Sequence, residues 1–271
     1  MSRNTLANTH TLLHHALNYA VYPAQLISSN PADYIKVPKN APRNVIKRHI
    51  ITPERFSALL EKHPFGTPYY IPLMLLYHTG MRISEVLGLS WADVDFVAKR
   101  INVSRQLCYR NSQGYYLDDP KTKSSKRYII IDDMLLNELL RWQARQVENE
   151  KQSGDSYVYI YRESDGRVIR QSKIIPAPNG EKISLVCTVT DGRLVLRDVI
   201  GKLLRKAGLN AHSFRHTHTT VLTENGAPAK AIAGRLGHAN VQITQNLYTH
   251  NTLKLQAAAV INFAKTLQTN A

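Results

Sequence analysis

The chain has 271 residues, of which 43% are hydrophobic, enough for one large core or for a large and a small domain. Its 35 lysine and arginine residues outnumber its 20 aspartate and glutamate residues, and the net charge of +15 favours a polyanionic partner and salt-sensitive binding. No apolar run approaches the roughly 20 residues that span a bilayer, and the N-terminus lacks a signal-peptide hydrophobic region, so we expect a cytoplasmic protein without membrane contact. Cys108 and Cys187 fit no metal-ligand spacing and indicate reduced thiols.

Residues 1–35 show the spacing of one or two helices, which Asn30-Pro31 interrupts. The residues that recur at helical spacing are Leu12, Leu13, Ala16, Leu17 and Ala20. Residues 36–51 form a basic linker without an acidic residue. Its cations are Lys36, Lys39, Arg43, Lys47 and Arg48. They suit an extended strap over a phosphate backbone, although a plain interdomain linker explains the segment nearly as well.

A large domain is predicted over residues 52–271. It begins with a capped helix, because Thr52 is a good N-cap and Pro53 suits the first turn. The run HTGMRISE at 78–85 places a glycine just before a second helix, so Arg82 should lie near a helix N-terminus, where anions are favoured. Glu85 follows one turn later and is expected to orient Arg82.

The next segments alternate between strands and helices. Residues 100–131 carry β-forming residues and predict a three-stranded sheet with turns near 112–114 and 121–125, followed by a helix from Asp132-Asp133 to about Glu150. Residues 156–196 predict further short strands with turns at 165–166, 179–180 and 191–192. From Leu196 onward the pattern is helical, with glycines at 208, 226 and 237 as stops. The fold class is therefore mainly α with small antiparallel β-sheets.

Several polar side chains in this domain suit phosphodiester chemistry. Two guanidiniums, those of Arg82 and Arg215, can clamp the non-bridging oxygens of a phosphodiester in transfer. The phenol of Tyr248 can attack phosphorus if a neighbour such as His212 or His238 shares its proton, which would attach the tyrosine covalently to DNA. The leaving sugar oxygen needs a proton, and the basic run PKTKSSKR at 120–127 offers donors.

Taken singly, each of these residues has a more ordinary explanation as a surface charge, a structural histidine or a core tyrosine. The five histidines at 212, 216, 218, 238 and 250 do not indicate zinc, because no cysteine or carboxylate completes a familiar ligand spacing and two arginines would repel a cation. We expect neither a metal nor a cofactor. The chain carries an arginine, a basic turn, His-x-x-Arg, Gly-His and a tyrosine in that order. This ordered series favours phosphodiester chemistry over the ordinary explanation of each residue.

That series resembles the catalytic domain of the tyrosine recombinases, the phage and conjugative-transposon integrases. The resemblance runs from about Ile51 to the C-terminus and rests on HTGMRISE (78–85), HSFRHTH (212–218), RLGH (235–238) and YTH (248–250). It implies site-specific recombination of a mobile element through a 3′-phosphotyrosyl intermediate and a Holliday junction. The residues that it implies around the scissile phosphate are Arg82, His212, Arg215 and His238, with Tyr248 as the nucleophile.

The resemblance also places a catalytic lysine on a β-hairpin. The strand after this hairpin reads YIII at 128–131 and lacks the proline that often marks the family's register. We favour Lys123 as the catalytic lysine and keep Lys121 as its rival and as a candidate DNA contact. Lys126 and Arg127 are expected to contact the DNA backbone.

Further implications concern assembly. Residues 1–35 resemble only part of the family's helical core-binding domain, which leaves full encirclement of DNA in doubt. A C-terminal helix at 252–268 is expected to dock on a neighbouring protomer and to link a homo-tetramer on paired double-stranded DNA sites, with a possible DNA-bending or excision factor as accessory partner. Two alternatives stay open: a truncated integrase that acts as a DNA-binding regulator, and a type IB topoisomerase-like nicking-closing enzyme.

Overall fold

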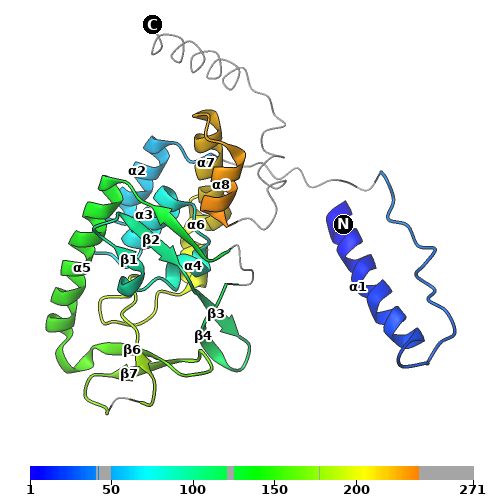
Figure 1. Ribbon diagram of the computed structural model, residues 1–271, viewed down its shortest axis with the longest axis horizontal. Helices are drawn as coiled ribbons and strands as arrows, with labels where there is room; N and C mark the ends of the chain where they lie inside the picture. The colour runs from blue at the N-terminus through cyan, green and yellow to red at the C-terminus, as the bar shows by residue number, and fades with distance from the viewer. Residues whose placement is uncertain (41, 43–49, 121–124, 177, 238–271) are drawn as a thin grey trace, which may run out of the picture. The chain divides into compact units, whose positions relative to one another are not determined.

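The computed structural model describes residues 1–40, 42, 50–120, 125–176 and 178–237 (Figure 1). The chain divides into two compact units, Met1–Arg48 and His49–Ala271. The boundary between them falls inside the segment expected to be a basic linker. Among the described residues, no helix has both the length and the apolar character needed to cross a membrane.

Within its described residues, the first unit contains one helix, α1 (Arg3–Val21). The segment after it folds back on the polar side of the helix, because the Asn30 amide donates to His14 O at 3.0 Å and to Asn18 Oδ1 at 2.6 Å. No residue of α1 is buried, and Leu12 of the predicted apolar stripe is 74% exposed. The periodicity therefore predicted a helix correctly, while the stripe finds no core within this unit.

The second unit holds the other helices and all strands of the described residues (Figure 1). The helices are α2 (Pro53–Lys62), α3 (Tyr70–Thr79), α4 (Ile83–Leu87), α5 (Asp133–Ser153), α6 (Arg197–Lys206), α7 (Ala211–Glu224) and α8 (Ala229–Leu236). The strands are β1 (Val94–Asp95), β2 (Arg100–Val103), β3 (Gln106–Arg110), β4 (Gly114–Asp118), β5 (Arg127–Ile130), β6 (Val158–Arg162), β7 (Val168–Ser172) and β8 (Glu181–Lys182). The predicted mainly α fold with small antiparallel sheets is confirmed.

Helix α3 runs through the middle of the core. It is apolar on all sides, which is typical of a buried helix, and seven of its residues are buried. It packs against α4, α5 and α7, so the helices on either side of it are fixed relative to one another. The core continues through Trp142 of α5, whose indole nitrogen donates to Val186 O at 2.8 Å, and through Phe214 of α7, which is fully buried.

The region 100–131 departs from the single three-stranded sheet that was expected. Its outer strands β2 and β5 pair antiparallel and β1 completes that sheet, whereas β3 and β4 form a separate hairpin. The chain leaves the first sheet at 104–105, where Ser104 Oγ and Arg105 Nη2 donate to the buried Asp93 carboxylate at 3.0 and 3.3 Å. These contacts to a carboxylate outside the strands redirect the hairpin, and strand propensity alone could not reveal them.

Residues 156–196 form the predicted short strands. Strands β7, β6 and β8 make a small antiparallel sheet, with positive-φ glycines at Gly166 and Gly192 in two of the expected turns. This sheet lies at the end of the unit away from α7 and α8 (Figure 1). Strand β7 contacts β4, so the insert packs on the β3–β4 hairpin.

The last described part of the chain is helical, as predicted. Helices α6, α7 and α8 are followed by Gly208, Gly226 and Gly237, all with positive φ. At Gly80, the C-cap of α3, φ is 65° and an added Cβ would lie 2.9 Å from Leu236 Cδ2 of α8. Glycine suits this position because other residues rarely adopt the positive φ and because an added Cβ would also lie 3.1 Å from His218 Cβ of α7, where the ends of α3 and α8 come close to α7.

Candidate active site

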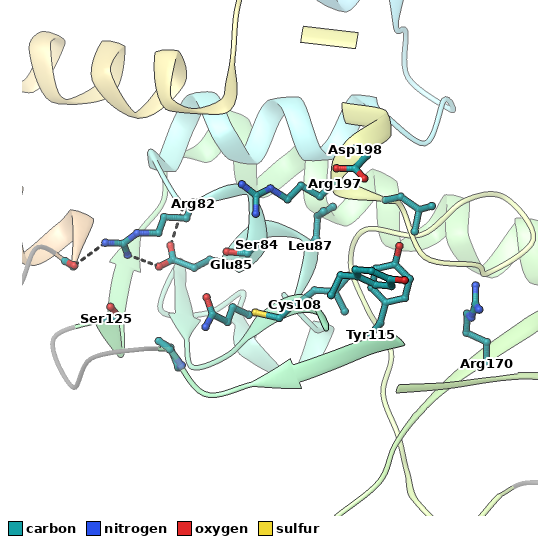
Figure 2. A pocket seen from close by; sticks show the side chains of 16 residues that line it. Arg82, Ser84, Glu85, Leu87, Cys108, Tyr115, Ser125, Arg170, Arg197 and Asp198 are labelled. Carbon is teal, nitrogen blue, oxygen red and sulfur yellow. Dashed lines mark hydrogen bonds and ion pairs between the residues drawn. The ribbon is translucent and has the colours of Figure 1, made fainter. Parts of the chain in front are cut away.

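Arg82 is held at the start of a helix, as its sequence context predicted. It is the N-cap residue of α4, and its backbone N–H donates to Glu85 Oε2 at 2.9 Å. Its Nη1 donates to Glu85 Oε1 at 2.7 Å, so the expected orienting contact from Glu85 is present (Figure 2). The Arg82 side chain keeps 37% of its surface exposed. It therefore faces solvent with its guanidinium already fixed.

Arg215 approaches the same place from α7. Its side chain is buried, and its Nη1 and Nη2 donate to Gly80 O at 3.1 Å and to Leu236 O at 2.6 Å. Burial, followed by the positive charge of Arg82, lowers the pKa of Arg215 to about 9. The group remains protonated at neutral pH, so the two arginines form a cationic pair close to solvent.

The C-terminal end of α8 organises this cluster. Three successive carbonyls, those of Arg235, Leu236 and Gly237, accept hydrogen bonds from Arg127, Arg215 and Arg82 at 2.6, 2.6 and 3.3 Å. The last carbonyls of a helix have no partner inside the helix and carry partial negative charge, so guanidiniums satisfy them well. The helix end thus fixes three arginines just before position 238.

Arg127 does not lie at the surface, which corrects the expectation that it contacts the DNA backbone. Its side chain is 6% exposed and its Nη1 and Nη2 donate to the two Glu85 oxygens at 3.2 and 3.0 Å. Desolvation opposes ionisation of Glu85, but the hydrogen bonds and charge of Arg127, with the contacts from Arg82, outweigh it and lower the pKa of Glu85. The guanidinium of Arg127 is used inside the protein.

The cluster carries excess positive charge. Within the described residues, the Glu85 carboxylate binds Arg82 and Arg127, and Arg215 feels its charge without a direct bond. A phosphodiester placed against the exposed side of Arg82 would compensate part of this excess and would accept charge-assisted hydrogen bonds. The arrangement therefore has the character of an anion-binding site with preorganised donors.

His212 lies in the first turn of α7, one turn before Arg215. Partial desolvation, followed by the positive charges of Arg215, Arg82 and Arg197, lowers the pKa of His212. The imidazole is therefore neutral at physiological pH and can accept a proton. Arg82, His212 and Arg215 thus come together as the sequence predicted.

A groove of about 1060 Å³ extends from Arg82 along α4 and β3 toward α6 and β7. Arg197 extends over this groove in the direction of Arg82, and Arg170 lies at its far side near Tyr115 (Figure 2). Among the described residues, neither the Arg197 nor the Arg170 guanidinium has a hydrogen-bond or ion-pair partner. The groove is therefore lined by cations at both ends.

Next to Arg235 lies a half-buried neutral histidine. His218 donates through Nδ1 to Tyr77 O at 3.3 Å, and its Nε2 accepts from Arg235 Nε at 2.9 Å. Burial, followed by the charge of Arg235 and with smaller contributions from His78 and Arg215, lowers the pKa of His218 to about 4. The unfolded chain takes up this proton below a pH of about 6.5, while the folded protein resists it until about 4.

Stability should therefore fall as the pH decreases from about 6.5 to about 4, and His218→Gln should flatten this dependence. The free energy of unfolding should change by on the order of 3 kcal/mol at most across this pH range. The measurement is the thermal midpoint of both proteins across this pH window. Parallel curves for the two proteins would show that His218 does not titrate with folding.

Other predicted site residues lie at the surface or outside the described residues. Lys126 is exposed, and its Nζ donates to Asp119 at 2.8 Å. Lys36 and Lys39 are exposed in an irregular segment of the first unit. The residues outside the described part are Arg43, Lys47, Arg48, Lys121, Lys123, His238 and Tyr248, together with half of the basic linker and the expected helix at 252–268.

Sequence reasoning missed two parts of this site. It did not single out Arg197. The available signal was the predicted helix start at Leu196, because anions bind near helix N-termini and Arg197 is the next residue. It also missed the inward role of Arg127 and of the α8 carbonyls. Nothing local marks them, because their partners are distant in sequence.

Comparison with known proteins agrees with this geometry. The profile of the phage integrase family matches residues 52–254. A tyrosine recombinase XerC-like protein of Caldanaerobacter subterraneus is 30% identical over 69% of this chain and 46% of its own length, and the ICEBs1 integrase of Bacillus subtilis is 28% identical over 92% and 62%. The chain thus spans about half of the first relative and about three fifths of the second.

Among solved structures, a Tn1549 transposon integrase in complex with transposon right end DNA superposes with a TM-score of 0.71 at 25% identity. The superposition covers 97% of this chain and 80% of that one. The family match covers most of the second unit, and the fold and the converging arginines are consistent with it. The chain belongs to the phage integrase family.

Proposed function

We propose that this chain is a tyrosine-type site-specific recombinase that integrates and excises a mobile genetic element. The observation that carries the proposal is the convergence of Arg82, His212 and Arg215 beside the end of α8, where excess positive charge faces an open groove. The likeness to the ICEBs1 integrase and to a transposon integrase bound to transposon end DNA supports a mobile element as the substrate.

In the proposed reaction, Tyr248 Oη attacks the scissile phosphorus and the bond to the 5′ oxygen breaks. Arg82 and Arg215 stabilise the charge on the non-bridging oxygens, and neutral His212 is suited to share the tyrosine proton. A hairpin lysine, Lys123 in our assignment, gives the leaving oxygen its proton. The products are a 3′-phosphotyrosyl ester and a free 5′-hydroxyl, and ligation reverses the step because the ester conserves the bond energy.

Recombination requires this step at paired sites. We place two pairs of strand exchanges through a Holliday junction in a homo-tetramer on two double-stranded DNA sites. The apolar face of residues 252–268 is the proposed link between protomers, because it would bury on a neighbour. A DNA-bending or excision factor is a further proposed partner.

The test of this function is a two-site assay. Plasmids that carry the joined ends of the encoding element and its target site are incubated with the protein, and recombinant joints are detected by amplification across them. Recombinant joints support the proposal. Supercoil relaxation without joints would favour the topoisomerase-like alternative, and salt-sensitive binding with neither product would favour the DNA-binding regulator.

Within this function, Arg197 is proposed to contact a phosphate of the DNA strand that occupies the groove. Arg197→Gln should lower the slope of log affinity against log salt by about 1 and weaken binding uniformly across DNA sequences. The measurement is DNA affinity by fluorescence anisotropy at several salt concentrations. Lys202→Gln is the matched control, because Lys202 lies on the same helix but lines a separate cavity with Leu59 and His63. Equal slopes for both variants would contradict the contact.

A further inference from the structure

Arg127 occupies a central place in the site that no step of the proposed reaction uses. Its guanidinium makes four hydrogen bonds from a buried position: two to Glu85, one to Ser125 O at 3.0 Å and one to Arg235 O at 2.6 Å. Four bonds to three separate segments require the planar, forked geometry of an arginine. A lysine keeps the charge but offers a single nitrogen.

Each of the two Glu85 carboxylate oxygens accepts one hydrogen bond from Arg82 and one from Arg127. Oε1 accepts from Arg82 Nη1 and from Arg127 Nη1, and Oε2 accepts from the Arg82 backbone N–H and from Arg127 Nη2. The bidentate contact with Arg127 therefore fixes the plane of the carboxylate that holds Arg82. Without it, the Glu85 carboxylate could rotate and Arg82 would lose its preset direction.

The other two contacts reach the rest of the machinery. Ser125 is the first described residue after the segment that carries Lys121 and Lys123, so Arg127 binds the chain directly after that segment. The Arg235 carbonyl belongs to the α8 end, where the next two carbonyls accept from Arg215 and Arg82. Arg127 thus contacts the carboxylate that holds Arg82, the chain just after the segment of the two candidate lysines, and the end of α8.

We propose that Arg127 is a positioning residue that holds Glu85, and through it Arg82, in a fixed geometry with the end of α8. The inference rests on the proposed recombinase function. Catalysis is sensitive to misplacement of groups by about 1 Å, whereas DNA affinity is spread over many phosphate contacts. Loss of Arg127 geometry should therefore reduce the rate of cleavage and leave affinity almost unchanged.

The test compares Arg127→Lys with the wild type in single-turnover cleavage of a nicked suicide substrate. Two leaving groups are used: the natural 5′ oxygen and a 5′ sulfur, which leaves without a proton. Arg127→Lys should slow cleavage at the oxygen substrate about tenfold or more, with DNA affinity within about twofold. The loss at the sulfur substrate should be similar, because Arg82 acts on the non-bridging oxygens with either leaving group.

Arg141→Lys is the matched control, because Arg141 forms an exposed ion pair with Glu138 on α5, away from the groove. Thermal unfolding of each variant establishes an assay temperature at which all are folded. A loss of DNA affinity as large as the loss of cleavage rate, or normal cleavage by Arg127→Lys, would overturn the positioning role while the recombinase function stands. No cleavage by the wild type would overturn the proposed function itself and this inference with it.

Discussion

Tyr248→Phe is expected to abolish the covalent protein–DNA adduct and to leave DNA affinity nearly unchanged. The phenol oxygen is the proposed nucleophile, so its removal deletes the bond-forming atom. The ring and its packing remain, and DNA binding depends mostly on phosphate contacts made by other residues. The measurement is a denaturing gel of reactions on nicked suicide substrates with EDTA present, combined with an equilibrium binding titration.

Tyr128→Phe provides the control for this experiment. Tyr128 is 61% exposed on β5, where its ring stacks under the Arg100 guanidinium, and its hydroxyl has no proposed role. It should form adduct at the wild-type rate. An adduct formed by Tyr248→Phe at normal rate would remove the tyrosine from the mechanism, whereas absence of an adduct from both variants and the wild type would favour the DNA-binding regulator.

The part of the site that could be predicted from sequence is the part built by local interactions. Gly80 ends α3, Arg82 caps α4 and Glu85 returns to Arg82 within one turn, so one short run of sequence contains all the partners. His212 and Arg215 share a face of α7 for the same reason. Their meeting with Arg82 was inferred from the order of motifs and a resemblance, because spacing alone cannot bring two distant segments together.

The part that could not be predicted depends on long-range contacts. In the sequence, Arg127 belongs to a basic run and looks like a surface charge, but β5 pairs with β2 and packs near α8, which turns its side chain toward Glu85. Burying this cation is acceptable only because a carboxylate 42 positions away in the chain compensates it. The split of the 100–131 sheet has a similar origin, because the buried Asp93 carboxylate binds Ser104 and Arg105.

Lys123→Ala should slow DNA cleavage by about 10² to 10⁴-fold, the usual range for loss of a general acid, while DNA affinity changes little. The leaving 5′ oxygen is a strong base and needs a proton as its bond to phosphorus breaks. Replacing that oxygen by sulfur removes this need, since a thiolate is a stable leaving group. The 5′-sulfur substrate should therefore restore cleavage by Lys123→Ala to nearly the wild-type rate.

Lys121→Ala decides between the two candidate lysines, because both belong to the same short basic run and carry the same charge. If Lys123 is the acid, Lys121→Ala should bind DNA more weakly and with a smaller salt dependence, as expected for loss of a phosphate contact. The 5′-sulfur substrate should then not restore its cleavage rate. If Lys121→Ala is the variant that sulfur restores, the register assigned without the proline is wrong and the roles exchange. If the 5′-sulfur substrate restores cleavage by neither variant, the proton comes from another group, and the basic run at 120–127 serves only to bind DNA.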